Sequence, residues 1–558
     1  MVANTRNPVS RTIRRIFSAL AGAAILVTGG VFAQEPRIVT SDIPSPEVLE
    51  EQNARIGTIT VEPQNIFDLS NPEENKTLYR WANALHVVTK PNVIRGQLLF
   101  NEGDQYSLRL IDETERLLRQ NDYLRDVQIE PVRFEDGVVD LRVATADVWT
   151  LTPSISAGRE GGENHFGLGV KEQNLFGNGM LLHFKYKSTV DRDTMTLDFA
   201  NRHFRGSRDH LAFRIGNNSD GYDHRFYFAR PFFSLDSRRS YGFALSAEDL
   251  TEPLYDRGEV ISDFQHTLQH HDLFAGRSAG LRNGWVQRFF AGVVYDDHEF
   301  APTPLTVDPI SLVPEDRKYI YPYLGFETIE DDFVTAENFD KIGRVEDRFL
   351  GTRVAIRVGY SPEAFGSSID AWHYNASFTN AIVASKKSSF TVATSLSGRY
   401  EDGDTQNFLL FLETRFHRRL TDSQLFYASV TATGSDNLDL DNQLLLGGDS
   451  GLRGYPLRYQ GGQAKALLTL EHRIFTDWYP WRFFNVGAAI FFDAGRTWGD
   501  NPVGAPNLGL LRDVGIGLRL GSNRLGEGGV LHIDFAFPLD GEETIDNFQI
   551  LIDARSSF

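Results

Sequence analysis

The chain has 558 residues, with 56 lysines and arginines against 75 aspartates and glutamates, so its formal net charge is −19. This acidic balance argues against nucleic acid as a partner, because phosphate backbones repel it. The absence of cysteine excludes disulfides and thiol chemistry. The aromatic content is high, with 41 phenylalanines and 19 tyrosines.

Residues 1–33 have the pattern of a secretory signal peptide. Four arginines without any acidic residue come first, and an apolar run over residues 16–27 follows. An uncleaved membrane anchor is the alternative, but Gly29 and Gly30 keep the apolar core shorter than a bilayer span. We therefore predict cleavage between Ala33 and Gln34, export of the mature chain, and a linker over residues 34–55 that contains at most one short helix.

Residues 56–148 have the pattern of a small α+β domain. Strands are expected at residues 57–61, 126–132 and 138–144, and helices at residues 75–86 and 107–120. Ser107 is placed to cap the second helix. The predicted order is therefore β-α-α-β-β.

From residue 149 to residue 558 the chain alternates apolar and polar residues at the period of a β-strand. Residues 182–187, 195–199 and 353–360 each place apolar side chains on one face and polar ones on the other. A transmembrane barrel conceals its lipid-facing residues at this period, and no run of eighteen apolar residues follows Ala33. At roughly 25 residues per strand and connection, about 16 antiparallel strands fit. A secreted soluble β-sandwich has the same alternation and is the alternative.

The end of the chain favours the barrel. Phe548, Ile550, Ile552 and the terminal Phe558 fall on one face of the last expected strand, with polar residues mainly on the other. An aromatic last residue in such a strand resembles the assembly signal of outer-membrane barrels.

Residues 447–455 are predicted to form a loop built around one arginine. Gly451 and Gly454 allow the backbone to turn through positive φ, and Arg453 between them carries five donors in a fork that fits a carboxylate. Asp493 lies forty residues further on in an apolar, strand-like run, and Glu471 lies on the intervening strand as a second candidate acceptor. A solvated loop arginine is the alternative.

These features together resemble the BamA/TamA-type outer-membrane assembly and two-partner-secretion superfamily. In this resemblance residues 56–148 are a polypeptide-transport-associated (POTRA) domain, and residues 149–558 are a bacterial surface antigen barrel. The resemblance also implies that the loop folds back into the barrel and is fixed to its inner wall. The loop residues that match are Leu452, Arg453, Gly454 and Tyr455, and the wall residues are Asp493 and Gly495, with Glu471 as a further acceptor.

The function that the resemblance implies is movement of polypeptide into or across the outer membrane without ATP. The expected partners are outer-membrane lipids, unfolded client polypeptides in the periplasm, and accessory periplasmic or lipoprotein subunits. The client polypeptides are expected to be taken up along an exposed strand edge of the POTRA-like domain. Assembly of barrel proteins is the first hypothesis, and dedicated secretion of one exported protein is the second. A passive porin is the alternative from another class, although it explains neither the N-terminal domain nor the loop.

Other motifs are given simpler interpretations. Residues 448–451 match the serine environment of chymotrypsin-like proteases, but no other part of a triad is recognisable. His266, His270 and His271 have a spacing that converges on a metal only in a helix, and residues 436–441 lack the pattern of a calcium loop. We therefore predict no catalysis, no metal and no cofactor.

Overall fold

The computed structural model describes residues 43–306, 312–385, 387–501, 508–526, 529–542 and 545–555. The predicted signal peptide with its cleavage site at Ala33 and Gln34, and the terminal Phe558, lie outside these ranges. Within them, no helix is both long and apolar enough to cross a membrane.

A small α+β domain comes first and has the predicted β-α-α-β-β order, with two short helices added. Its elements are α2 (Pro46–Glu51), β1 (Arg55–Gln64), α3 (Thr77–Leu85), α4 (Pro91–Arg95), α5 (Leu108–Arg119), β2 (Leu124–Glu135) and β3 (Val138–Asp147). The sheet order is β1-β3-β2, with β1 parallel and β2 antiparallel to β3. Leu49 of α2 is buried in the core of this domain, so packed structure begins inside the stretch expected to be a linker. Ser107 is at the N-cap of α5, but its side chain makes no capping hydrogen bond.

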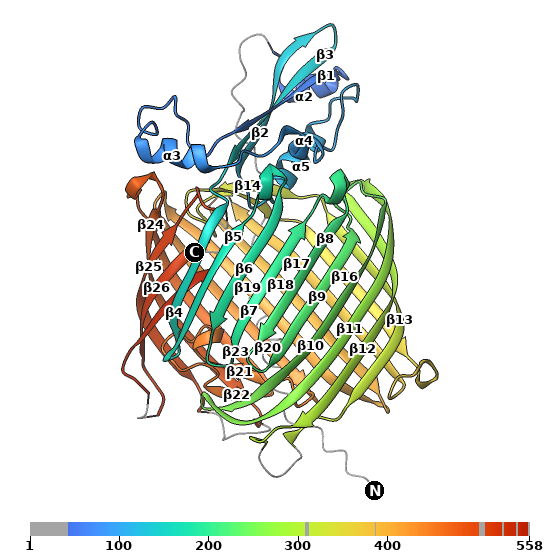
Figure 1. Cartoon of the computed structure of the whole chain (residues 1–558), viewed down its shortest axis with the longest axis vertical. Helices are drawn as coiled ribbons and strands as arrows, with labels where there is room; N and C mark the ends of the chain where they lie inside the picture. Colours follow the sequence, from blue (N-terminus) through green and yellow to red (C-terminus); the bar gives the residue numbers. More distant parts are fainter. Residues whose placement is uncertain are drawn as a thin grey trace.

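The rest of the described chain forms a closed antiparallel barrel, which confirms the predicted fold class (Figure 1). Its strands are β4 (Leu151–Glu160), β5 (Glu163–Glu172), β6 (Met180–Ser188), β7 (Asp193–Asn201), β8 (His210–Asn218), β9 (Gly221–Arg230), β10 (Arg239–Asp256), β11 (Glu259–Arg282), β12 (Trp285–Pro302), β13 (Arg317–Glu330), β16 (Thr352–Ser361), β17 (Ala371–Ser385), β18 (Ser388–Glu401), β19 (Asp404–Thr421), β20 (Gln424–Asp436), β23 (Ala464–Phe475), β24 (Asn485–Trp498), β25 (Leu511–Gly521), β26 (Val530–Pro538) and β27 (Gln549–Arg555). The last strand, β27, is the neighbour of the first, β4, and this junction is called the seam below.

The strand number differs from the expectation of about 16. Among the described residues the barrel has 20 strands. The cause lies in residues 151–230, where six strands of nine or ten residues follow one another through short turns. An average of roughly 25 residues per strand, suited to longer strands and loops, therefore undercounts this part of the wall.

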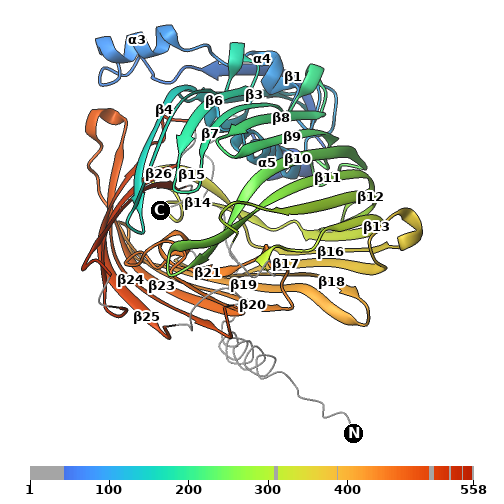
Figure 2. The same ribbon diagram turned by 60° about the horizontal axis from the view of Figure 1, so that its bottom comes forward.

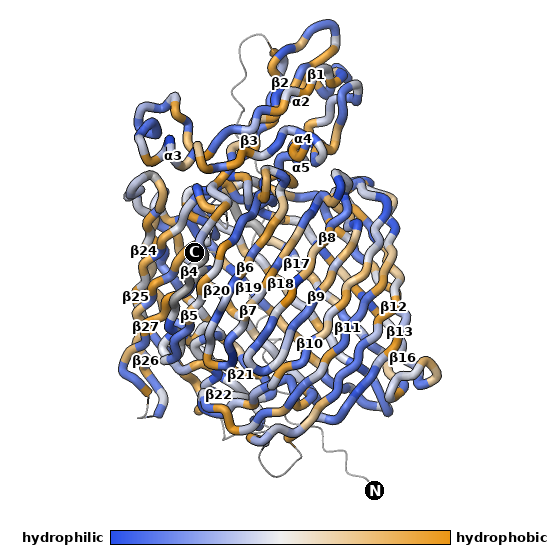
Figure 3. The backbone as a smooth tube through the Cα atoms, viewed as in Figure 1, coloured by the Kyte–Doolittle hydropathy of each residue, from blue (hydrophilic) through white to orange (hydrophobic). Residues whose placement is uncertain are grey.

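The alternation in the sequence corresponds to two faces of the wall. On β16, Ile356 and Val358 are exposed on the outside, and on β27 the buried Gln549 and Leu551 alternate with the less buried Ile550 and Ile552. Figure 3 shows hydrophobic and hydrophilic residues alternating along the strands. This is the pattern of a barrel with an apolar outer surface and a polar interior.

Two segments fold into the barrel from opposite ends. The rim beside the N-terminal domain is called the near rim, and the opposite rim the far rim. From the near rim, β14 (Phe333–Glu337) and β15 (Val345–Phe349) form a hairpin, termed the near-rim hairpin, whose Phe339 and Ile342 pack in a buried cluster with wall residues such as Leu425 and Phe475. From the far rim comes the loop between β20 and β23, which contains β21 (Leu444–Leu446), η5 (Gly448–Ser450) and β22 (Gln460–Gly462). Figure 2, turned to bring the far end forward, shows both segments within the outline of the barrel.

The N-terminal domain is fixed to the near rim and to the near-rim hairpin (Figure 1). Arg119 of α5 makes a bidentate contact with Asp347 of β15, with Nε–Oδ2 and Nη2–Oδ1 distances of 2.8 and 2.7 Å. Glu113 of the same helix accepts a hydrogen bond from the backbone N–H of Leu235, in the turn between β9 and β10, at 2.7 Å. Burial raises the pKa of Glu113, against the opposing effects of the Leu235 N–H and Arg109. Helix α5 therefore connects the domain to both the wall and the hairpin.

Candidate functional site

The loop around Arg453 is held in shape by its own backbone. Gly451 follows η5 with φ of 105°, a left-handed conformation that favours glycine. The N–H of Leu452 donates to the carbonyl of Gly447 at 3.0 Å, and the N–H of Tyr455 donates to that of Leu452 at 3.1 Å. Ser450 Oγ accepts from the N–H of Gly447 at 2.8 Å, so this hydroxyl has a local structural role. The turn presents Arg453 to the inner wall.

Arg453 is buried and is paired with carboxylates of three strands. Its Nε and Nη2 donate to the two carboxylate oxygens of Asp493, on β24, at 2.7 and 3.0 Å. Its Nη1 donates to Glu471, on β23, at 2.9 Å and to Asp534, on β26, at 3.3 Å. The guanidinium also lies 3.4 Å above the ring centroid of Phe491. Every face of the fork thus meets an acceptor or a π-system, which a buried arginine requires.

Further charged residues complete this cluster. Arg473 donates to Glu471 at 2.9 Å, Arg519 of β25 donates to Asp534, and Asp513 accepts the backbone N–H of Gly454 at 3.1 Å. The structure brings Arg453, Asp493 and Glu471 together, as the sequence motif suggested. The sequence reasoning missed Asp534, Asp513, Arg473 and Arg519 as members of the cluster. Residues 515–519 and 534–539 are notable in the sequence as glycine-rich or alternating strands, but the direction of their charged side chains depends on strand register.

Gly454 of the loop and Gly495 of the wall serve close approach rather than backbone rotation. Gly454 is not among the residues with positive φ, contrary to the expectation from sequence. A Cβ at this position would lie 2.7 Å from the Cβ of Asp513 and 3.0 Å from the nitrogen of Pro538. On the wall, a Cβ at Gly495 would lie 2.9 Å from a methyl carbon of Leu446 and 3.2 Å from one of Leu452. Both positions therefore allow the loop to touch the wall backbone.

We expect Gly454→Ala to weaken the docking of the loop without unfolding the barrel. The added methyl group meets backbone atoms that cannot rotate away, and such overpacking costs about 1–3 kcal/mol. The measurement is the rate at which a protease cleaves the loop in the detergent-solubilised protein. Gly403→Ala is the control, because it lies in a far-rim turn where an added Cβ has no neighbour within 4 Å. Its φ of 83° costs some strain there. Equal cleavage of the loop in both variants would contradict the close-approach argument.

Leu452 and Tyr455 hold the loop by packing and by hydrogen bonds. Both side chains are buried, in a cluster with Leu446, Tyr459 and Leu511. The hydroxyl of Tyr455 lies 2.7 Å from the carbonyl oxygen of Arg512 and 3.0 Å from that of Asp540. The loop is therefore attached to β25 and to the segment after β26 as well as through Arg453.

A chain of contacts links this site to the N-terminal domain. Arg473, which contacts Glu471, also donates to the carbonyl of Phe339 in the near-rim hairpin at 3.2 Å. The hairpin is in turn bound by Arg119 of α5 through Asp347, and Arg344 of the hairpin donates to the carbonyl of Leu124 at 2.8 Å. The loop from the far rim and the hairpin from the near rim thus share the wall residues around Glu471.

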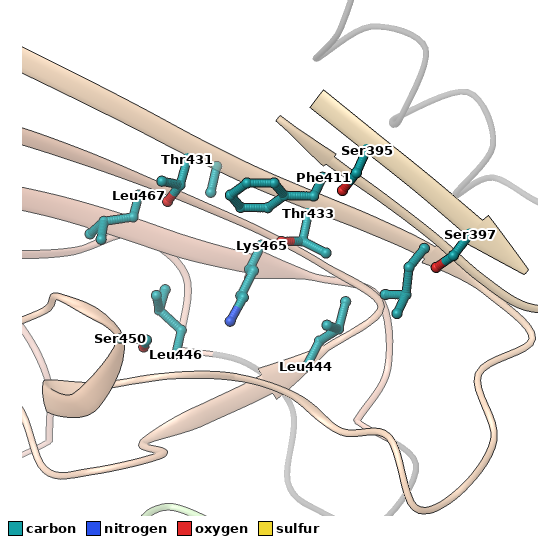
Figure 4. Close-up of a pocket in the computed structure, with 12 residues that line it drawn as sticks. Ser395, Ser397, Phe411, Thr431, Thr433, Leu444, Leu446, Ser450, Lys465 and Leu467 are labelled. Carbon is teal, nitrogen blue, oxygen red and sulfur yellow. The ribbon is translucent and has the colours of Figure 1, made fainter. Parts of the chain in front are cut away.

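A cavity of about 490 Å³ lies between the loop and the neighbouring wall strands β18–β20. Figure 4 shows Leu444, Leu446 and Ser450 on the loop side, with Thr431, Thr433 and Phe411 on the wall side. Lys465 projects into the gap, where its Nζ donates to the carbonyl of Leu445 at 2.8 Å. The loop is therefore packed tightly against β23–β26 and loosely against β18–β20.

The remaining candidates are placed as follows. His266 stacks on His298, with ring centroids 5.2 Å apart, and His270 contacts Asp296 at 2.8 Å, while His271 stacks on Tyr295. Within the described ranges, no group of three or more histidine or acidic side chains could hold a metal ion. Phe548 is exposed beside β27, next to the ring of Phe537.

The sequence model of the Omp85 superfamily domain matches residues 350–554, which include the loop, its wall partners and the last strand. Over this segment the chain is similar to the Omp85 superfamily domain. The matched segment contains Arg453 together with the three carboxylates that bind it, and over this segment the match agrees with the resemblance seen in the sequence.

Solved structures that align with most of the chain include one BamA and two CdiB proteins. BamA from Haemophilus ducreyi, lacking POTRA domains 1–3, is 13% identical, with 90% of this chain and 85% of that chain covered and a TM-score of 0.39. CdiB from Escherichia coli is 14% identical, with 91% and 77% covered and a TM-score of 0.48. CdiB from Acinetobacter baumannii is 13% identical, with 90% and 74% covered and a TM-score of 0.41. Among curated protein sequences no match was found.

Proposed function

We propose that this protein is an outer-membrane polypeptide transporter that assembles barrel proteins into the membrane without ATP. The observation that carries the proposal is the binding of Arg453 by Asp493, Glu471 and Asp534 within the segment that matches the Omp85 superfamily domain. In this proposal the N-terminal domain faces the periplasm and receives unfolded client chains. The loop then braces the wall beside the seam while the first and last strands serve as a template for the client.

The two segments that fold into the lumen argue against the passive porin. A diffusion pore requires a continuous aqueous path, whereas here the near-rim hairpin and the Arg453 loop both pack on the inner wall. The N-terminal domain also lies over the near rim (Figure 1). A transporter whose closed state must not leak solutes accounts for all three features.

Client recognition at the edges of the N-terminal sheet is restricted by side chains that occupy the edge strands. On β1, the N–H of Ile59 donates to Glu102 at 3.1 Å and its carbonyl accepts from Arg95 at 2.5 Å. On β2, the N–H of Ile129 donates to Glu115 at 2.8 Å. At these two positions the expected strand edge is not open, because a capped N–H resists strand addition. In our proposal a client strand binds by β-augmentation only when these carboxylates turn away.

The experiment that tests the proposal is reconstitution of the purified protein in liposomes without nucleotide. An unfolded outer-membrane barrel protein is added, and its folded fraction is followed by heat-modifiable electrophoretic mobility. We expect faster folding than in empty liposomes, and a loss of this acceleration in the Arg453→Ala variant. If folding is not accelerated and the unfolded chain passes into the liposome interior, dedicated secretion is supported instead. If folding is not accelerated, the chain does not enter and small solutes pass freely, the porin is supported.

A further inference from the structure

Helix α3 carries an apolar face that the described part of the chain leaves uncovered. Leu78, Trp81 and Leu85 are 68, 69 and 72% exposed and, at positions i, i+3 and i+7, form one stripe. A second face of the same helix is packed, because Tyr79 is buried and stacks on Phe67 with ring centroids 4.5 Å apart. The helix is therefore fixed by one face while it presents another apolar face outward.

This helix lies against the near rim of the barrel. The hydroxyl of Tyr79 donates to the carbonyl of Trp481 at 2.9 Å. Trp481 belongs to η6 (Pro480–Arg482), in the near-rim turn between β23 and β24, and Figure 1 shows α3 above this turn at the edge of the wall. Trp478 and Trp481 are 66 and 72% exposed. The exposed stripe and two exposed tryptophans thus occupy the same part of the rim.

The apolar row continues on the other side of the seam. After α3 the chain reaches η1 (Leu175–Gly177), the near-rim turn between β5 and β6, where the N–H of Lys90 donates to the carbonyl of Gly177 at 3.0 Å. Phe176 in this turn is exposed, as is Val87 of the connecting segment. Strands β24 to β27 and β4 to β5 lie between η6 and η1. Residues 77–90 therefore span the near rim across the seam.

We propose that α3, together with η6 and η1, is a membrane-interface anchor that binds the lipid surface beside the seam. Two observations support lipid as the occupant. The row is continuous with the exposed apolar outer face of the barrel, represented here by Ile490 and Ile516 on β24 and β25. Exposed tryptophans are typical of the boundary between the hydrocarbon core and water.

The consequence is a fixed position of the N-terminal domain relative to the membrane surface. Contiguous exposed apolar surface of this kind marks a site of interaction. A helix held in the interface at the seam places the lipid surface next to the two strands that would part during insertion. The inference depends on the transmembrane position of the barrel and is independent of whether the protein transports polypeptide.

The test uses the full-length chain, which has no native cysteine and so accepts single cysteine probes. Leu78→Cys and Trp81→Cys probe the stripe, and Arg80→Cys probes another face of the same helix. Val138→Cys is the matched control, because it is an exposed apolar residue at the start of β3, away from the rim. Each variant is labelled with an environment-sensitive fluorophore, reconstituted alone into phosphatidylethanolamine and phosphatidylglycerol vesicles, and exposed to lipids with a spin label near the headgroup.

We expect a blue shift and strong quenching at positions 78 and 81, and little of either at positions 80 and 138. Since no other protein is present, quenching by labelled lipid identifies lipid as the occupant. Equal quenching at positions 78, 80 and 81, or none at 78 and 81, would overturn the proposal. Protection of positions 78 and 81 only after an accessory protein or client is added would assign the face to that partner instead. All four positions are exposed, and retained heat-modifiable mobility checks that the barrel is folded.

Discussion

Replacement of Arg453 by alanine is expected to release the far-rim loop from the wall. The substitution leaves Asp493, Glu471 and Asp534 buried without their common counter-charge, and removal of one partner from a buried ion pair costs about 3–5 kcal/mol. The barrel itself is held by the hydrogen bonds of its strands and should stay folded. The loop, residues 437–463, should become cleavable by protease, and the thermal unfolding temperature of the purified protein should fall.

The matched control is Arg458→Asn in the same loop. Arg458 pairs with Asp191 at 2.7 and 2.8 Å, but both side chains are 22% exposed, so the pair is partly screened and its loss costs about 1 kcal/mol or less. Asparagine is chosen because φ at this position is 52°, a conformation that it tolerates. If both variants destabilise the loop equally, burial of the Arg453 cluster is not what holds the loop.

Removal of the near-rim hairpin is expected to have a large effect on conductance only in combination with Arg453→Ala. Replacing residues 335–347 with a short glycine–serine turn removes Phe339 and Ile342 from the inner wall and eliminates the Arg119–Asp347 contact. The Arg453 loop still lies in the lumen in this variant, just as the hairpin does in Arg453→Ala. We therefore expect single-channel conductance in planar bilayers to rise modestly in each single variant and most strongly in the double variant.

Glu135→Ala with Asp136→Ala, at the exposed β2–β3 turn remote from the rim, serves as a control for the conductance measurement. Strict additivity of the two single effects would indicate two independent leaks rather than two blocks along one path. A wild-type conductance as large as that of the double variant would show that the hairpin and the loop do not close the lumen.

The sequence was sufficient for the class of fold and for the centre of the site. The signals used were period-two alternation, the absence of a long apolar run and the glycine-flanked arginine. These signals are local, so they can be recognised without knowledge of the strand register. Arg453, Asp493 and Glu471 could be nominated in this way. Asp534 could not, because it lies 81 residues from Arg453 and meets it only when strands β23 to β26 pair in one particular register.

Other features depend on packing that the sequence does not show. In the sequence, the near-rim hairpin resembles an ordinary polar connection between two strands. Only the burial of Phe339 and Ile342 in the structure reveals that it enters the lumen. Gly454 is notable as a glycine, but the reason for it, contact with Asp513 and Pro538, is tertiary. The apolar stripe of α3 can be recognised in the sequence by its helical spacing, and this spacing predicts an ordinary buried face. The structure shows instead that the stripe is exposed at the rim.

The most direct test of the central claim is the outer-membrane proteome and secretome of a strain depleted of this protein and complemented with wild type, Arg453→Ala or Arg458→Asn. We predict a broad fall in barrel proteins on depletion, rescued by wild type and by Arg458→Asn but not by Arg453→Ala. Unchanged levels of both barrel proteins and secreted proteins on depletion would contradict the assignment of polypeptide transport.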